Sequence, residues 1–132
     1  MHHATGSFDV KGSLQKPDNP QAEASGLGRM SLDKQYHGDL EAASQGEMLS
    51  VLDKAVGSGG YVAMERVTGK LQGKSGSFVL QHNATMTRGV PEMNIIVVPD
   101  TGTGELTGIS GSMKIRIEEG GKHFYDFDYT LS

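Results

Sequence analysis

Hydrophobic residues alternate with polar ones along most of this 132-residue chain, and this period of two constrains the fold more than any other feature. Phe8 and Val10, for example, are separated by Asp9, and the same alternation returns in segment after segment. Residues two positions apart lie on one face of a β-strand, so the pattern predicts strands with one buried face. We find no amphipathic segment long enough for a helix of three turns.

The alternation divides the chain into eight predicted strands, joined mostly by short glycine-rich turns. These cover about residues 8–14, 30–40, 41–52, 61–70, 75–86, 92–98, 107–118 and 122–131. Lys34 and Gly38 interrupt the alternation in the second segment, the third is also compatible with a helical turn, and residues 17–28 form one long polar loop. Eight strands in meander order predict a single all-β domain, residues 1–132, as a sandwich or a closed up-and-down barrel. We favour the barrel, because closure removes exposed strand edges.

The register of the last hairpin follows from the requirement that apolar residues share a face. A two-residue loop at residues 120–121 would place Ile115 beside Asp126. A three-residue loop at residues 119–121 instead pairs Ile115 with Tyr125. We expect the second register, because a slip of one residue turns every side chain to the wrong face.

Glu65 and His82 fall on a predicted inward face that is otherwise apolar. A two-residue turn at residues 72–73 puts Glu65 opposite Leu80, with His82 two positions further along the same face. A carboxylate and an imidazole inside an apolar barrel suit acid–base chemistry or the binding of a polar ligand head. The alternatives are a structural polar contact, or a register shifted by one residue that turns both side chains outward. The second-rank candidates in that shifted register are Arg66, Gln81 and Asn83.

Apolar and aromatic residues on the same inward faces complete the candidate ligand-binding set. The members of this set are Tyr61, Phe78, Leu80, Tyr125 and Tyr129, together with Glu65 and His82. The interior of an eight-stranded barrel is either just filled by side chains or wide enough for one small ligand. A buried tyrosine serves the core more often than it contacts a ligand, with its hydroxyl bonded to backbone or water.

Composition and charge argue against several classes of function. The chain has no cysteine, which excludes disulfides and thiolate chemistry, and a net charge of −4 without basic clusters argues against nucleic-acid binding. The longest aliphatic run, residues 95–98, is too short to span a bilayer. The N-terminal segment lacks the apolar stretch of a signal peptide, so we expect a cytoplasmic protein. The five histidines show no metal-ligand spacing, and we expect neither a metal nor a cofactor.

The run Asp100-Thr101-Gly102 follows an apolar strand, as the catalytic aspartates of aspartic peptidases do. Those enzymes need two such aspartates that share a proton. This chain holds one copy, so a dimer would have to supply the second. We interpret the run as a turn that ends a strand.

Two segments are specific enough to suggest a family: ERVTGKLQGKSGSFVLQH at residues 65–82 and VVPDTGTGEL at residues 97–106. Weaker matches are ATGSFDV at residues 4–10 and DFDY at residues 126–129. Together they resemble, over nearly the whole chain, an uncharacterised bacterial family of small proteins known as a domain of unknown function. The resemblance implies an eight-stranded barrel similar to that of allene oxide cyclase, and it implies no activity. The chain departs from the family pattern in lacking a tryptophan before Val97.

Three functions are compatible with these observations. The leading hypothesis is a module that binds one small, largely apolar molecule inside the barrel. An isomerase- or cyclase-type enzyme would use the same cavity, with Glu65 as base or charge stabiliser and His82 as its partner. The third hypothesis is a structural barrel without ligand that forms a homodimer through the outward apolar residues Ile96 and Val98.

Overall fold

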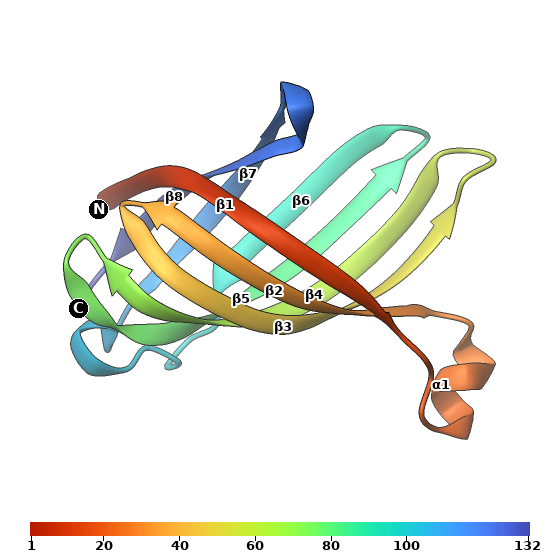
Figure 1. The fold of residues 1–132 in the computed structure, drawn as a ribbon, viewed down its shortest axis with the longest axis horizontal. Helices are drawn as coiled ribbons and strands as arrows, with labels where there is room; N and C mark the ends of the chain where they lie inside the picture. Colours follow the sequence, from red (N-terminus) through yellow and green to blue (C-terminus); the bar gives the residue numbers. More distant parts are fainter.

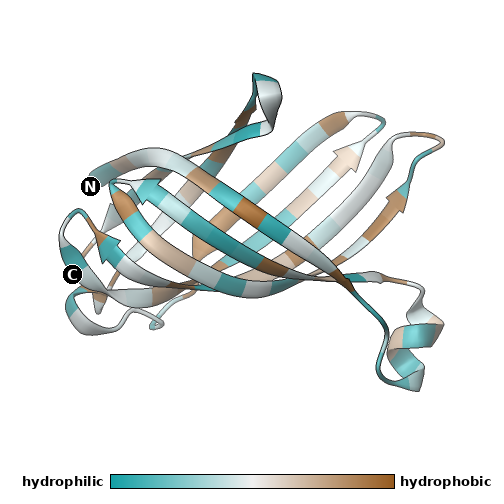
Figure 2. Cartoon of the chain, in the orientation of Figure 1, coloured by the Kyte–Doolittle hydropathy of each residue, from teal (hydrophilic) through white to brown (hydrophobic).

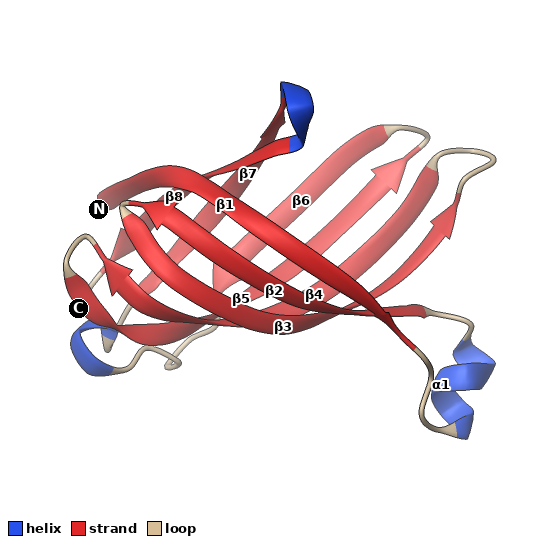
Figure 3. Ribbon diagram, in the orientation of Figure 1, coloured by secondary structure: helices blue, strands red, loops and turns tan.

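The chain folds into a closed barrel of eight antiparallel strands, each paired with the next in sequence and the last with the first (Figure 1, Figure 3). This computed structural model describes all 132 residues and confirms the predicted fold class. The strands are β1 (His2–Gln15), β2 (Gly28–Gly38), β3 (Leu40–Asp53), β4 (Ser58–Leu71), β5 (Lys74–Thr87), β6 (Val90–Val97), β7 (Ser110–Glu118) and β8 (Lys122–Thr130). Figure 2 shows alternating hydrophobic and hydrophilic bands along these strands, as a period of two requires.

We predicted only a polar loop at residues 17–28, but this segment contains a short helix, α1 (Pro20–Ser25). The Asn19 side chain accepts a hydrogen bond from the backbone N–H of Ala22 at 2.8 Å, and Pro20 begins the helix. Gly26 ends it in the left-handed conformation, with φ at +68°. These are ordinary start and stop signals of a helix. None of the helices has the length and apolarity that a membrane crossing requires.

Both predicted hairpin registers are confirmed. Glu65 lies opposite Leu80 in the β4–β5 hairpin. The two turn residues, 72–73, have φ values of +47° and +86°, which match the twist of a tight two-residue turn. Ile115 lies opposite Tyr125 in the β7–β8 hairpin, with a three-residue connection at Glu119–Gly121. The inward faces of these four strands are therefore those expected from the sequence.

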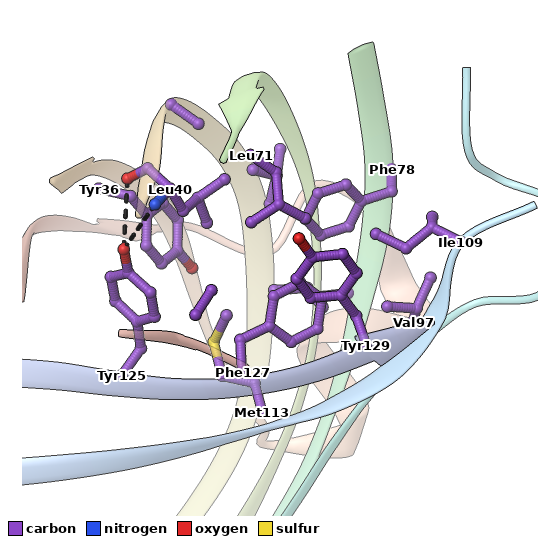
Figure 4. Packing of buried hydrophobic residues seen from close by; sticks show 14 of the residues in the cluster. Tyr36, Leu40, Leu71, Phe78, Val97, Ile109, Met113, Tyr125, Phe127 and Tyr129 are labelled. Atoms are coloured by element: carbon purple, nitrogen blue, oxygen red, sulfur yellow. Dashed lines mark hydrogen bonds between the residues drawn. The ribbon is translucent and has the colours of Figure 1, made fainter. Parts of the chain in front are cut away.

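One end of the barrel, which we call the packed end, is filled by side chains. Phe78 stacks on Phe127 with ring centroids 5.7 Å apart, and Tyr125 meets Tyr36 edge-on at 5.6 Å. Figure 4 shows these rings converging with aliphatic side chains in one cluster. The connection between β6 and β7 closes this end, because its Leu106 is buried in the same core. The two chain termini also lie at this end (Figure 1).

The opposite end, the open end, has an incomplete wall between β6 and β7. These strands pair only at Ile95–Met113 and at Ile96–Ser112, so the rest of β6 and β7 have no partner across this seam. Figure 1 shows the β7–β8 hairpin lying apart from β6 at the end opposite the termini. The barrel is thus closed around its middle and its packed end, and open where four connections between strands form the rim.

We expect Gly46→Ala to destabilise the barrel by about 1–3 kcal/mol. A Cβ atom there would lie 2.1 Å from the backbone oxygen of Met64 and 2.8 Å from the Cα of Glu65, so backbone would have to move. Gly12→Ala is the matched control, since its Cβ would meet only the flexible side chain of Met30, with Sδ at 2.6 Å. Denaturant unfolding measures both variants. Equal losses of stability would show that space beside Gly46 is not limiting.

Candidate functional site

Four side chains donate hydrogen bonds to the carboxylate of Glu65, which lies inside the barrel between its packed and open ends. Oε1 accepts from the hydroxyls of Tyr36 at 2.5 Å and Ser44 at 2.8 Å. Oε2 accepts from Lys34 Nζ at 2.7 Å and from His82 Nε2 at 2.6 Å. We call these five residues the Glu65 cluster. It joins four consecutive strands, β2 to β5.

The Glu65 cluster is buried, and the protein itself supplies all the hydrogen bonds that its carboxylate accepts. The Glu65 side chain is 0% exposed, and those of Lys34 and His82 are 6% and 3% exposed. Burial alone raises the pKa of the Glu65 carboxyl, but the hydrogen bond from His82 and the charge of Lys34 outweigh it and hold that pKa at about 2, below its ordinary 4.5. With two bonds to each oxygen, the acceptor sites of this carboxylate are full.

Strand pairing brings the cluster together from distant positions in sequence. Lys34 lies directly opposite Ser44 across β2 and β3. Gly46 lies opposite Glu65 across β3 and β4, and its missing side chain leaves room for the backbone and Cβ of Glu65. His82 lies one inward position beyond the residue paired with Glu65. All of these residues have the inward parity of their strands, so closure of the sheet directs their polar groups to one point.

The open end holds an apolar cavity of about 340 Å³ next to this cluster. We call it the cup; its lining residues are Phe8, Val10, Gly12, Met30, Leu32, Lys34, Met48, Tyr61, Ala63, His82, Met93, Ile115, Ile117 and His123. Lys34 and His82 lie at its floor, with Glu65 buried behind them. A second hollow of about 330 Å³ shares Met48, Tyr61 and Met93 with the cup.

The residues that we predicted as a ligand-binding set are divided between the two ends of the barrel. Tyr61 and His82 line the cup, and Glu65 lies directly behind His82. Phe78 and Leu80 are fully buried in the core of the packed end and do not line the cup. The structure therefore brings only part of the set to one cavity.

Tyr125 and Tyr129 also belong to the packed end. The Tyr125 hydroxyl accepts from the backbone N–H of Leu40 at 2.8 Å and donates to the carbonyl of His37 at 2.8 Å, and Figure 4 shows the contacts with Leu40. Burial raises the pKa of Tyr125 to about 12. The Tyr129 hydroxyl donates to the side chain of Gln72. Both hydroxyls are thus occupied within the protein, which is the core role expected of most buried tyrosines.

The second-rank candidates face away from the interior. Arg66, Gln81 and Asn83 are exposed, because the confirmed β4–β5 register turns their positions outward. Ile96 and Val98, the residues we expected to form an outer apolar strip, are half-buried.

Sequence reasoning missed three members of the cluster: Lys34, Tyr36 and Ser44. Lys34 shares the parity of Leu32 and Tyr36, so its side chain points inward although its charge interrupts the apolar pattern. One signal for the cluster was available in the sequence: a lysine at an inward position of one strand, and Glu65 at an inward position two strands away. Burying a lysine requires a paired opposite charge, and Glu65 supplies it.

The run at residues 100–102 is a turn after β6, as interpreted. Thr101 Oγ1 donates to the carbonyl of Val98 at 2.7 Å and accepts from the backbone N–H of Val79 at 3.1 Å. Asp100 adopts a positive φ of +64°. No group of three His, Cys, Asp or Glu side chains in the structure could hold a metal ion.

A family model described as "Protein of unknown function (DUF3224)" matches residues 4–129. The chain belongs to the DUF3224 family. A DUF3224 protein of unknown function from Shewanella oneidensis MR-1, known from a crystal structure, is 50% identical and superposes with a TM-score of 0.90 over 100% of this chain and 98% of that chain. No curated protein matches. The bacterial family suggested by the motifs is confirmed, and membership in DUF3224 assigns no activity.

We expect acid to destabilise the fold through Glu65. A carboxyl whose pKa falls on folding stabilises the protein above its unfolded pKa of 4.5, and this contribution is lost as the pH falls through about 2. The lowering of this pKa from 4.5 to about 2 corresponds to about 3 kcal/mol in the free energy of unfolding. Between pH 5 and pH 2, the free energy of unfolding of the native protein should therefore fall by about 3 kcal/mol more than that of the variant Lys34→Met/Glu65→Gln. Urea denaturation at the two pH values measures this difference.

The double variant is the right comparison because it removes both charges together. Glu65→Gln alone would leave Lys34 without its counter-charge, at a cost of about 3–5 kcal/mol. Parallel pH profiles for the native protein and the double variant would contradict the low pKa of Glu65.

Proposed function

We propose that this DUF3224 barrel binds one small, largely apolar molecule in the cup. The observation that carries the proposal is the half-filled interior, packed at one end and hollow at the other. A volume of about 340 Å³ lies within the range of small-molecule sites, which are mostly apolar with a few polar groups that orient the ligand. The floor of the cup supplies such groups from Lys34 and His82.

Binding accounts for the Glu65 cluster better than acid–base catalysis does. A general base needs a pKa near the working pH and access to the proton that it removes. The Glu65 carboxylate has a pKa of about 2, no exposed surface and two hydrogen bonds on each oxygen. It would have to lose a partner before it could accept a proton. An isomerase or cyclase that uses Glu65 as its base is therefore the weaker candidate.

We expect the neutral fluorescent probe N-phenyl-1-naphthylamine to bind the native protein and gain fluorescence. Leu32→Trp should weaken this binding by about tenfold or more, because a larger side chain from the wall would occupy the small cup. Leu27→Trp makes the same replacement at an exposed position outside the cup and should leave binding unchanged. Fluorescence titration measures all three proteins.

The absence of probe binding to the native protein would contradict a ligand-binding cup. Equal binding by Leu32→Trp and the native protein would place the probe elsewhere on the barrel. Circular dichroism and urea denaturation of both variants establish that each is folded before its titration is interpreted.

Self-association is a second candidate, favoured by an exposed apolar patch on the outer face of β3 and β4. The patch consists of Leu49, Val51, Val62 and Met64, which are 45–59% exposed. Leu49 and Val62 are register partners, and the Arg29–Glu47 ion pair adjoins them, so charges of both signs flank the patch. A second copy turned about a two-fold axis presents the same apolar surface and both charge signs. We propose this face, rather than that of β6, as the homodimer contact.

We expect the native protein to elute as a dimer at high micromolar concentration and Val62→Lys to elute as a monomer. A lysine at the centre of the patch would bury a charge without a partner in the interface. Light scattering coupled to size-exclusion chromatography measures both masses, with Lys114→Met as a surface control on β7. A monomeric native protein would exclude this contact.

A further inference from the structure

The floor of the cup has hydrogen-bonding groups that the protein does not use. An ammonium group has three N–H donors, and Lys34 Nζ makes one hydrogen bond, to Glu65. His82 donates from Nε2, because the carboxylate that it contacts can only accept. In the neutral ring, Nδ1 is then an acceptor without a protein partner. Both side chains are more than nine-tenths buried and both line the cup.

These unused groups are an uncommon arrangement for a protein interior. Buried polar atoms nearly always have partners, and no fully buried side-chain nitrogen or oxygen here lacks one. The free capacity of Lys34 and His82 therefore faces the cavity and not the core. Around these groups the wall is apolar, with the Phe8 ring centroid 5.2 Å from Lys34 Nζ. A molecule that enters the cup can satisfy the donors of Lys34 and the acceptor of His82 at once.

The charges at the floor of the cup determine which charge the polar head group of a ligand can carry. With His82 as the neutral ring, the charges of Lys34 and Glu65 cancel each other, and Tyr36 stays neutral because burial and the charge of Glu65 raise its pKa well above the ordinary value. Tyr61 and His123 are the other titratable side chains in the lining, and burial raises the pKa of Tyr61. An anionic head would add an unpaired negative charge close to Glu65, and a cationic head would face Lys34. Unpaired buried charge is costly, so a neutral head is favoured.

We infer that the ligand enters with a neutral head group that joins a carbonyl oxygen to an N–H or O–H donor, as in a primary carboxamide or a hydroxy ketone, on an apolar body. The carbonyl oxygen accepts from Lys34 and the donor reaches Nδ1 of His82. Lys34 Nζ lies next to the His82 ring, because Nζ and Nε2 both bond to Oε2 of Glu65, at 2.7 and 2.6 Å, and Nδ1 belongs to that same ring. This inference rests on the proposed function, and it names the chemical class of the molecule bound.

The test is displacement of N-phenyl-1-naphthylamine at neutral pH by three probes with similar apolar chains. Octanamide carries both a carbonyl and a donor, octan-2-one carries the carbonyl alone, and octanoate carries a charge. Octanamide should bind about tenfold more tightly than either of the others, which is the usual gain from one further satisfied hydrogen bond or one avoided buried charge. Octanoate or octan-2-one binding as tightly as octanamide would overturn the inference.

Two variants test whether the charged residues at the floor of the cup cause the preference for octanamide. Lys34→Met/Glu65→Gln removes both charges together and should abolish the preference for octanamide over octan-2-one. Lys114→Met, an exposed lysine on β7, should retain it. A preference that survives in the double variant would overturn the assignment to Lys34. Binding of the fluorescent probe to the double variant shows that its cup is intact.

The fluorescent probe also separates the two proposals. If the native protein does not bind it, the ligand-binding function fails, and the inference about the head group fails with it. If the native protein binds the probe but does not prefer octanamide, the cup is a binding site and only the head-group assignment is wrong.

Discussion

The ionised carboxylate of Glu65 is the group on which the interior of this barrel depends. Four donors from β2, β3 and β5 converge on it, so one side chain on β4 holds half of the sheet in a single register. Removing one partner of a buried ion pair leaves the other charge without compensation. A one-residue slip of any of these strands would turn its cluster member outward and incur that cost. The cluster therefore specifies strand alignment as well as contributing to stability.

The same cluster separates the two halves of the interior. On one side, aromatic rings and the β6–β7 connection fill the barrel, and Leu106 of that connection is buried in the core. On the other side, the short pairing between β6 and β7 leaves the sheet open, and the cup lies beside Lys34 and His82. A cluster whose central carboxylate has a pKa of about 2 and no free acceptor site is poorly suited to moving protons. It is well suited to hold two polar groups at fixed positions at the end of an apolar cavity, which is how binding sites orient a ligand.

Much of the architecture could be read from local signals. The alternation of period two predicted the strands, and the glycine turn at residues 72–73 determined the β4–β5 register that puts Glu65 and His82 on one inward face. The helix α1 could also have been predicted, since Asn19 and Gly26 are its cap residues and Pro20 its first residue, but the polar composition of the loop obscured it. In each case, the information lies within a few residues along the chain.

Only the tertiary structure decided which inward residues meet and which end of the barrel is hollow. Lys34 and Glu65 are 31 positions apart and contact each other because β2, β3 and β4 lie side by side in a curved sheet. Tyr125 has the same inward parity as the cup residues, yet it lies in the packed end, since strand parity gives the face of a side chain and not its depth in the barrel. Thus the sequence by itself determined strands, turns and faces, which depend on local backbone preferences and on the pleat. The buried charge cluster and the cup came from closure of the sheet, because closure sets the depth and neighbours of every inward side chain.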